Sequence, residues 1–226
     1  MNYHGNVTVG GAPDVRELAE LIITKVAVGP FDNNSYLLRC RYSGDQLLID
    51  AAAEPETLVR LVNGSLAKVV TTHQHGDHWQ ALEEVVAATG AETLAGRLDA
   101  EGIPVPTRTL VDDGDEITFG DARLRAIHLA GHTPGSIALL YTGPAGPADA
   151  ADPHGHPHLI TGDCLFPGGI GNTWKDPNRF NSLYQGVVTK IFDRLPDNTW
   201  VHPGHGKDTT LGAERPNLGE WLERGW

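Results

Sequence analysis

The sequence has few cysteines, no long apolar segment and a shortage of positive charge. Its two cysteines, Cys40 and Cys164, are too few for a disulfide framework, so a reducing, cytoplasmic location is expected. No stretch approaches the ~20 apolar residues that a membrane-spanning helix needs. With 17 Lys and Arg against 29 Asp and Glu, the net charge is -12, which argues against nucleic acid or an anionic membrane surface as partners.

The N-terminal segment also lacks the apolar core of a signal peptide. We expect residues 1–20 to form a flexible lead-in and residues 21–226 to form a single catalytic domain. The 226 residues, 40% of them hydrophobic, suffice to bury a substantial core. This composition fits a small soluble enzyme of undetermined oligomeric state.

Four potential metal ligands lie within six residues, in an H-x-H-x-D-H pattern: His73, His75, Asp77 and His78. Imidazoles at this density would repel one another on becoming charged, so metal binding is the chemistry that the pattern favours. Imidazole and carboxylate ligands suit zinc (Zn²⁺), with iron (Fe) and manganese (Mn) as competitors. The alternative without a metal is a polar turn with exposed histidines.

The flanking sequence predicts where this motif lies. Residues 67–72 are apolar and β-branched, as in a buried strand, and residues 78–89 show the apolar spacing of a helix. The motif should therefore lie in a strand-to-helix turn at the carboxyl end of a strand, where open α/β sheets tend to bind ligands. Because Asp77 and His78 come later in the turn than His73 and His75, their side chains can face a neighbouring point. The motif therefore predicts two adjacent metals.

Three later strand-like runs end in glycine-bearing turns that carry one potential ligand each. These ligands are His132 after the run 124–129, Asp163 after 158–160 and His205 after 198–200. Alone, each could be an ordinary turn or solvated residue. Their recurrence in one local context predicts that they complete a dinuclear metal site.

Together these motifs resemble the metallo-β-lactamase superfamily, from about Leu21 to the C-terminus. The motifs are His73-x-His75-x-Asp77-His78, Gly131-His132-Thr133-Pro134-Gly135, Gly162-Asp163 and Pro203-Gly204-His205-Gly206. The resemblance implies an α/β fold, the four-layer αββα sandwich with its metals at one edge of the paired sheets. It assigns one metal to His73, His75 and His132. It assigns the other to Asp77, His78 and His205, with Asp163 bridging the two.

The resemblance also implies a role for Asp50, which follows the strand-like run 46–49. That role is to orient a ligand histidine, and a simple turn residue is the alternative. The implied reaction is hydrolysis. A hydroxide shared by two metals, available because the cations lower the pKa of bound water to about 7, attacks a carbonyl. Asp77 would hold its metal and the hydroxide in line.

Within the superfamily, the chain is most similar to the short glyoxalase II-like group, which resembles hydroxyacylglutathione hydrolase. The implied substrate is a small-molecule acyl thioester. Two departures leave another thioester or a different ester open. Residues 172–174 read Asn-Thr-Trp where that group has Arg-Ser/Thr-Asp, and the chain ends at Trp226 without the helical extension that contacts glutathione. Trp174, Lys175 and Arg179 are the candidates for substrate contacts.

Other members of the superfamily fit less well. Class B β-lactamases lack the bridging aspartate and are exported. Acyl-homoserine lactonases carry a tyrosine where this chain has Phe166, although a lactonase or other ester hydrolase stays the first alternative. Persulfide dioxygenases use a single iron, and a non-catalytic metal-binding module would be expected to have lost ligands. All seven ligands are present, which favours hydrolysis without identifying the metal.

The remaining pattern predicts the secondary structure coarsely. Strands are expected near 21–28, 35–40, 46–50, 67–72, 92–95, 122–129, 136–142, 158–162 and 199–202, and helices near 55–63, 78–89 and 182–194. Residues 144–158 are rich in Pro, Gly, Ala and Asp and should form an exposed insertion, whose role the sequence leaves open. Its histidines, His154, His156 and His158, are expected to lie in a solvated loop.

Overall fold

Side chains that alternate along the strands build three separate apolar clusters, which define the layers of the fold. In the computed structural model, which describes residues 3–62, 64–144 and 155–225, Leu47 and Ile49 lie in the cluster between two sheets. Leu48, between them in sequence, lies in the cluster on the opposite face of its sheet. This period of two is the reason that one strand serves two interfaces.

The larger sheet contains seven strands in sequence order. They are β1 (Asp14–Glu17), β2 (Leu21–Val28), β3 (Asn33–Cys40), β4 (Gln46–Ile49), β5 (Leu66–Thr71), β6 (Glu92–Gly96) and β7 (Thr109–Val111). The strands from β1 to β4 pair antiparallel, whereas those from β4 to β7 pair parallel. The change follows from the connections, because helices α1 (Pro55–Leu61) and α2 (Leu82–Thr89) provide the crossovers that parallel neighbours require.

The second sheet has six strands in the order β15-β14-β11-β10-β9-β8. Their bounds are β8 (Glu116–Phe119), β9 (Ala122–His128), β10 (Ile137–Tyr141), β11 (His158–Gly162), β14 (Trp200–Pro203) and β15 (Thr209–Thr210). A small hairpin, β12 (Leu165–Phe166) with β13 (Gly169–Ile170), follows β11. Helix α3 (Pro177–Val187) and its π-helical continuation η3 (Val188–Phe192) join this hairpin to β14, and α4 (Leu211–Glu214) and α5 (Leu218–Arg224) close the described chain.

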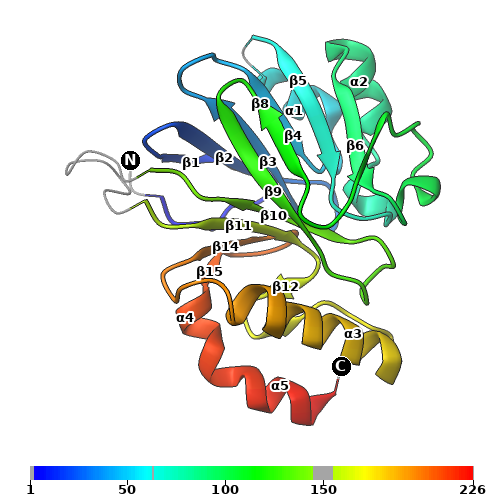
Figure 1. Cartoon of the computed structure of the whole chain (residues 1–226). Coiled ribbons are helices and arrows are strands. Elements are labelled where there is room, and N and C mark those ends of the chain that lie inside the picture. Colours follow the sequence, from blue (N-terminus) through cyan, green and yellow to red (C-terminus); the bar gives the residue numbers. More distant parts are fainter. Residues whose placement is uncertain (1–2, 63, 145–154, 226) are drawn as a thin grey trace.

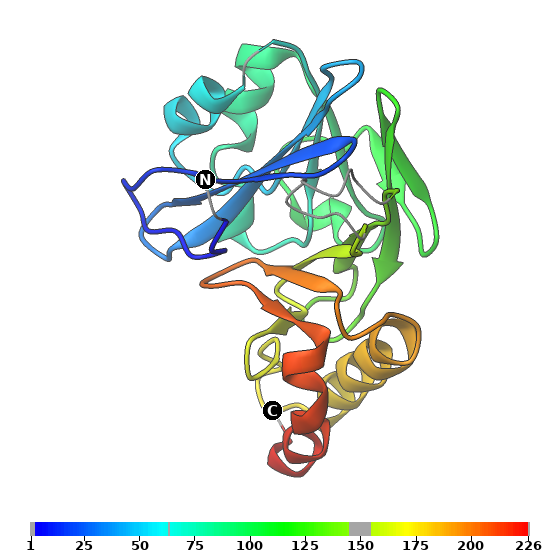
Figure 2. The ribbon, with the colours of Figure 1, turned by 90° about the vertical axis from the view of Figure 1, so that its left-hand side faces the viewer.

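Helices cover the outer face of each sheet (Figures 1 and 2). Helices α1 and α2 contribute Leu58 and Val85 to the cluster on the first sheet. On the second sheet, Leu183 of α3 and Trp221 of α5 pack into the remaining cluster. Helix, sheet, sheet and helix thus form four layers, and the expected αββα sandwich is confirmed.

Several segments differ from the expectation. Residues 14–17, within the expected flexible lead-in, form β1 and pair with β2, and the Tyr3 ring packs edge-on at 5.9 Å from the Trp200 ring. The helix expected over 182–194 begins at Pro177, because the Asp176 side chain accepts the first free backbone N–H groups. The short elements β7, β8, α4 and α5 were not expected, since three to seven residues carry little periodicity.

The insertion is only partly described, and His154 lies outside the described residues. His158 does not lie in a solvated loop: it begins β11, is fully buried and stacks on His202 at 5.3 Å. Within residues 3–62, 64–144 and 155–225, no helix has the length and apolar character needed to cross a membrane.

Candidate metal centre

The motif that dominates the sequence lies where it was expected, between β5 and α2. Strand β5 ends at Thr71, and a single helical turn, η1 (Gly76–His78), follows His75, whose backbone is extended. The turn closes when the His78 N–H donates to the His75 carbonyl at 3.0 Å. Because η1 reverses the chain, its carboxylate and imidazole meet the ligands that come from the second sheet.

One group of three imidazoles unites the first sheet with the turn after β9. His75 Nδ1 lies 2.9 Å from His132 Nε2, and the His73 ring lies 4.8 Å from each of those rings. Each of the three residues offers a ligand atom, and these atoms lie within 4.8 Å of one another. This is the trio that the resemblance assigned to one metal.

A second group joins η1 to the turn after β14. Asp77 Oδ2 lies 3.6 Å from His78 Nε2 and 3.4 Å from His205 Nε2. These three ligand atoms also lie within 4.8 Å of one another. The structure therefore brings together both predicted trios, whose members are up to 128 residues apart in sequence within one trio, from Asp77 to His205.

Asp163, at the end of β11, lies between the two groups. Its Oδ2 atom is 3.6 Å from His132 Nε2 and 3.5 Å from His205 Nε2, and its Oδ1 atom is 3.5 Å from His78 Nε2. One carboxylate thus faces ligands of both trios. This is the position that a bridging ligand requires.

The donor set fits two divalent metals. His73 Nε2 and Asp163 Oδ1 are buried, and neither has a hydrogen-bond partner within the described part of the chain. Buried polar atoms are costly when left unpaired, and a cation that accepts their lone pairs removes that cost. Nitrogen and carboxylate ligands in this ratio suit zinc, iron or manganese.

Four of the five candidate ligand histidines are oriented by a protein oxygen behind them. The contacts are His78 Nδ1 to Asp50 Oδ2 at 2.8 Å, His132 Nδ1 to the Asn172 carbonyl at 2.9 Å, His205 Nδ1 to the Phe31 carbonyl at 2.9 Å and His73 Nδ1 to Thr72 Oγ1 at 3.1 Å. Such contacts hold the ring so that its other nitrogen faces the metal. The predicted partner Asp50 adopts a left-handed backbone (φ 57°), and its Oδ1 accepts the Thr72 N–H at 2.7 Å.

Two residues that the sequence did not single out also hold the site. Asp99, fully buried after β6, accepts the Gln74 N–H at 3.0 Å and the Gly135 N–H at 2.6 Å, so it joins the turns that carry His75 and His132. Asn33 donates to Asp77 Oδ2 at 3.0 Å. Asp99 follows a strand, as the predicted ligands do, so the same rule could have found it. Asn33 carries no comparable signal.

The two trios differ in protonation in the metal-free protein. Burial is the main cause that lowers the pKa values of His73, His75 and His132, so these rings are neutral near pH 7 and ready to bind a cation. Burial also acts to lower the pKa of His205, but hydrogen bonds to Asp163 and Asp77 outweigh it and raise the pKa to about 10. A metal in the second trio therefore displaces a proton.

The three predicted substrate contacts lie beside His132. Trp174 and Lys175 adopt consecutive left-handed conformations (φ 53° and 59°), which are strained for residues other than glycine. The half-exposed Trp174 ring stacks on His132 at 5.3 Å, and Lys175 is exposed. The Arg179 guanidinium stacks on Trp174 at 4.2 Å and donates to the Gly131 carbonyl at 2.8 Å. Arg179 thus braces the turn that carries His132.

A cavity of about 530 Å³ opens next to these residues. Gln74, Gly131, Thr133 and Arg179 are among the residues that line it. Gln74, Gly131 and Thr133 are sequence neighbours of the first trio, and the three histidines themselves are not among the residues that line the cavity.

A second buried cluster of polar side chains lies behind the His205 turn; we call it the Lys25–Asp208 cluster, and it comprises Tyr3, Lys25, His158, His202 and Asp208. Lys25 Nζ lies 2.6 Å from Asp208 Oδ1, and the two side chains are 0% and 1% exposed. Lys25 also donates to the Gly206 carbonyl at 2.8 Å. Since Gly206 follows His205, this buried cation fixes the turn that presents the ligand.

Comparison with known proteins connects this geometry to a family. The sequence model of the Metallo-beta-lactamase superfamily matches residues 28–144. The hydroxyacylglutathione hydrolase of Rhodospirillum rubrum is 33% identical over 182 residues, which cover 77% of this chain. The match spans only 62% of that relative's own length.

Solved structures share the fold. The crystal structure of TTHA1623 in a di-iron-bound form is 31% identical, covers 84% of this chain and 96% of its own, and superposes with a TM-score of 0.65. The BLEG-1 B3 metallo-beta-lactamase superposes with a TM-score of 0.72, covering 86% of this chain and 96% of its own. Because the BLEG-1 enzyme is only 24% identical to this chain, its similarity supports the fold alone.

Proposed function

The chain belongs to the metallo-beta-lactamase superfamily, and we propose that its seven His and Asp ligands form a dinuclear metal centre that hydrolyses a small-molecule acyl thioester. The position of Asp163 between two complete trios carries this proposal. A mononuclear site would need only one trio, and both are present with ligand atoms within 4.8 Å of one another.

Zinc is the metal that the donor set favours, and iron is the main competitor because the relative TTHA1623 was crystallised in a di-iron form. When bound, two divalent cations supply Lewis acidity at the substrate carbonyl and lower the pKa of water to about 7. His73, His75 and His132 would hold one cation, and Asp77, His78 and His205 the other. Asp163 would bridge them.

Asp77 is the residue that we assign to positioning the attacking water. Hydrogen bonds from His205 and Asn33 outweigh burial and hold the pKa of this carboxyl well below its usual range, so it is ionised at neutral pH. Its side chain is 27% exposed, in contrast to the fully buried His78 beside it. An ionised carboxylate that reaches solvent can accept a hydrogen bond from a water molecule. This bond keeps the lone pair of the water oxygen directed at the substrate.

The substrate would enter past Trp174. The half-exposed indole stacks on His132 and offers an apolar surface over the first trio, and the cavity of about 530 Å³ lined by Arg179, which stacks on this indole, would take the acyl or thiol portion. Lys175, exposed on the same strained turn, could attract a carboxylate on the thiol carrier. The relative from Rhodospirillum rubrum, a hydroxyacylglutathione hydrolase, supports a thioester as the substrate class. A cytoplasmic location is proposed with it, because both cysteines are free thiols.

The alternative within the superfamily is hydrolysis of a lactone or another ester. Phe166 lies 6.4 Å from the His205 ring and has no hydroxyl group to offer an ester substrate. This side chain supports the proposal of a thioester over a lactone.

Elemental analysis of the purified protein, coupled to hydrolysis of S-lactoylglutathione by the same sample, tests the proposal. Two equivalents of metal with rapid turnover are the expected result. Two equivalents without turnover would retain a hydrolase but reject this thioester, and a panel of other thioesters and lactones would follow. A single equivalent of iron would contradict the dinuclear site and favour the dioxygenase reaction instead.

A further inference from the structure

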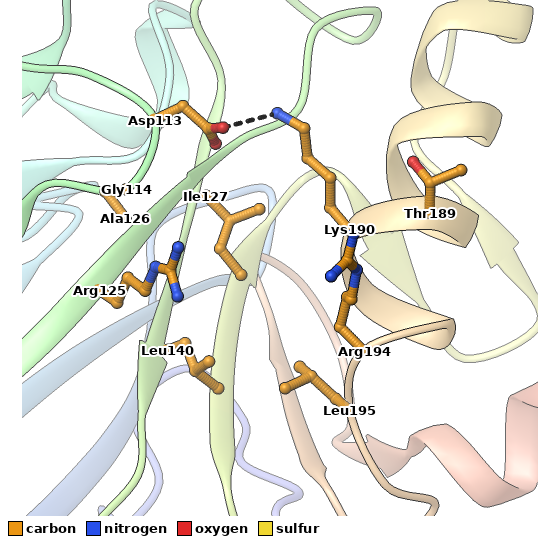
Figure 3. A pocket seen from close by; sticks show the side chains of 10 residues that line it. All are labelled: Asp113, Gly114, Arg125, Ala126, Ile127, Leu140, Thr189, Lys190, Arg194 and Leu195. Carbon is orange, nitrogen blue, oxygen red and sulfur yellow. Dashed lines mark ion pairs between the residues drawn. The ribbon is translucent and has the colours of Figure 1, made fainter.

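A second cavity, of about 500 Å³, lies between β9 and η3 (Figure 3). It separates the outer face of β9 and β10 from η3 and the residues that follow it. Arg125, Lys190 and Arg194 bring three positive charges to it, and Ile127, Leu140 and Leu195 provide apolar surface. We call this the basic groove. None of its lining residues belongs to the metal centre.

The charge of the basic groove is opposite to that of the chain. Its three cations face one lining carboxylate, Asp113, whereas the whole chain carries a net charge of -12. Lys190 Nζ lies 3.1 Å from Asp113 Oδ2 and donates to the His128 carbonyl at 2.9 Å. One cation and the one carboxylate thus neutralise each other, and two guanidinium groups remain.

Those two guanidinium groups reach the groove from opposite sides. Figure 3 shows Arg125, from β9, on one side of Ile127 and Arg194, from the chain after η3, on the other side. Neither guanidinium group forms an ion pair or hydrogen bond with another part of residues 3–62, 64–144 and 155–225. Glu116, directly opposite Arg125 in the sheet register, pairs instead with Arg123 at 3.7 Å.

We propose that the basic groove is a binding site for a small molecule that carries an oxyanion, phosphate or carboxylate, on an apolar body. Two guanidinium groups that line one cavity repel each other, and an anion bound in the cavity reduces that repulsion. The planar guanidinium donates two parallel hydrogen bonds, which match the oxygen spacing of both oxyanions. Ile127, Leu140 and Leu195 would contact the apolar body.

The groove is also connected to the His132 turn, which makes it more than an isolated patch. Lys190 donates to the His128 carbonyl, and the His128 ring lies 2.7 Å from the Pro134 carbonyl, two residues beyond His132. An anion that attracts Lys190 away from Asp113 would therefore act on the strand that leads to a metal ligand. The binding site itself does not depend on the hydrolase function.

The experiment is a titration of the metal-loaded protein with phenyl phosphate, followed by backbone amide NMR shifts. We expect shifts at residues 113–114, 125–127 and 189–195 that saturate, with weaker binding of inorganic phosphate and little effect of phenol. The comparison of phenyl phosphate with inorganic phosphate tests the contribution of the apolar side chains. The comparison with phenol tests the contribution of the charge. Shifts confined to residues 73–78, 131–133, 163 and 205 would place the ligand on the metals and overturn the proposal.

A matched pair of variants makes the test specific. The double variant Arg125→Ala/Arg194→Ala should weaken the binding of phenyl phosphate at least about tenfold, since it loses hydrogen bonds to a charged group. The control Arg39→Ala/Arg60→Ala removes the same charge from exposed residues of β3 and α1, at the other side of the sandwich. It should change affinity less than about twofold. Equal weakening in the two variants would mean general charge attraction and contradict a built site. All four arginines are exposed, and thermal unfolding of each variant verifies the fold.

Discussion

The metal centre and the Lys25–Asp208 cluster both contain histidine and aspartate side chains inside the same β-sandwich. They differ in which groups pair with these side chains. In the cluster, Asp208 accepts hydrogen bonds from Tyr3 at 2.6 Å and Trp200 at 2.9 Å and pairs with Lys25 at 2.6 Å. In the metal centre, an oxygen of Asp163 has no hydrogen-bond partner among the described residues. A lysine ammonium provides the cation for Asp208, whereas Asp163 Oδ2 faces the protonated His205 imidazole, whose proton a bound metal would displace.

This difference teaches that a high density of histidine and aspartate does not by itself make a metal site. The pKa of His158 falls to about 2 because burial and His202 both disfavour its charge, so it is as neutral as the ligand His73. Yet His158 stacks on His202 inside the fold, and His73 faces other ligands. The deciding feature is whether the protein pairs both oxygens of its buried carboxylate: both Asp208 oxygens accept hydrogen bonds, whereas Asp163 Oδ1 has no hydrogen-bond partner among the described residues.

The largest effect is expected when the metal centre loses its shared ligand. Asp163→Asn should reduce thioester hydrolysis at least about 10³-fold, because a neutral amide cannot balance two cations. Metal content should fall below two equivalents while circular dichroism still reports a folded protein. Full activity in Asp163→Asn after dialysis against a chelator would contradict the assignment of the site.

The corresponding change in the other cluster should act on stability. Lys25→Met leaves the Asp208 carboxylate buried without its cation, and we expect the free energy of unfolding to fall by about 3–5 kcal/mol. Urea denaturation measures this loss. The double variant Lys25→Met/Asp208→Asn serves as the control, since removing the uncompensated charge should recover part of the stability. If the double variant were less stable than Lys25→Met, the buried pair would not be the cause.

A smaller effect is expected where a protein carboxylate supports a ligand from behind. Asp50→Asn should weaken metal affinity roughly 10- to 100-fold, because the amide no longer fixes the His78 ring through its 2.8 Å contact. Competition with a chromophoric chelator measures the affinity. Glu92→Gln provides the control: Glu92 lies on β6, accepts an exposed hydrogen bond from Thr109, and its substitution should leave the metal affinity unaltered. Equal affinity of Asp50→Asn and the wild type would exclude an orienting role.

The pH dependence separates the two clusters further. Burial acts to raise the pKa of Asp208, but His202 and Lys25 outweigh it and hold the pKa well below its usual range. A lowered folded-state pKa stabilises the protein above the unfolded-state pKa of about 3.9 and loses that stabilisation as pH falls further. The stability gap between wild type and Lys25→Met should therefore narrow below about pH 4, by up to about 1.4 kcal/mol per pH unit. Urea titrations at pH 7, 4 and 3 measure it; a constant gap would be inconsistent with an ionised Asp208.

The smallest effect is expected at the rim of the metal centre. Trp174→Ala should raise KM for the thioester by roughly threefold to tenfold through loss of an apolar contact, with a smaller change in kcat. Steady-state kinetics measure the changes in KM and kcat separately. Tyr42→Ala removes another exposed aromatic ring, 68% exposed, and should leave KM unchanged. A fall in kcat alone would mean that Trp174 positions His132 rather than contacting substrate.

Much of the metal centre could be predicted because its signals are local. The H-x-H-x-D-H motif lies within six residues, and each later ligand follows a strand, so the rule that strand ends meet at one edge places them together. The start of α3 was missed although Asp176 and Pro177 are a recognisable helix start, because the apolar stripe was clearer further along. Lys25 could not be identified, since a lone lysine in an apolar strand carries no sign of its partner 183 residues away.

The sequence by itself determined the local chemistry: which turns follow strands, which of them carry imidazole or carboxylate groups, and which residues alternate toward the core. Only the tertiary structure decided which groups meet. His202 and His205 are three residues apart, yet His202 turns into the sandwich to pair with Asp208 at 2.8 Å, while His205 faces Asp77 and Asp163. The physical reason is that the packing of the two sheets, and the buried Lys25 that fixes the turn at Gly206, set the direction of each side chain.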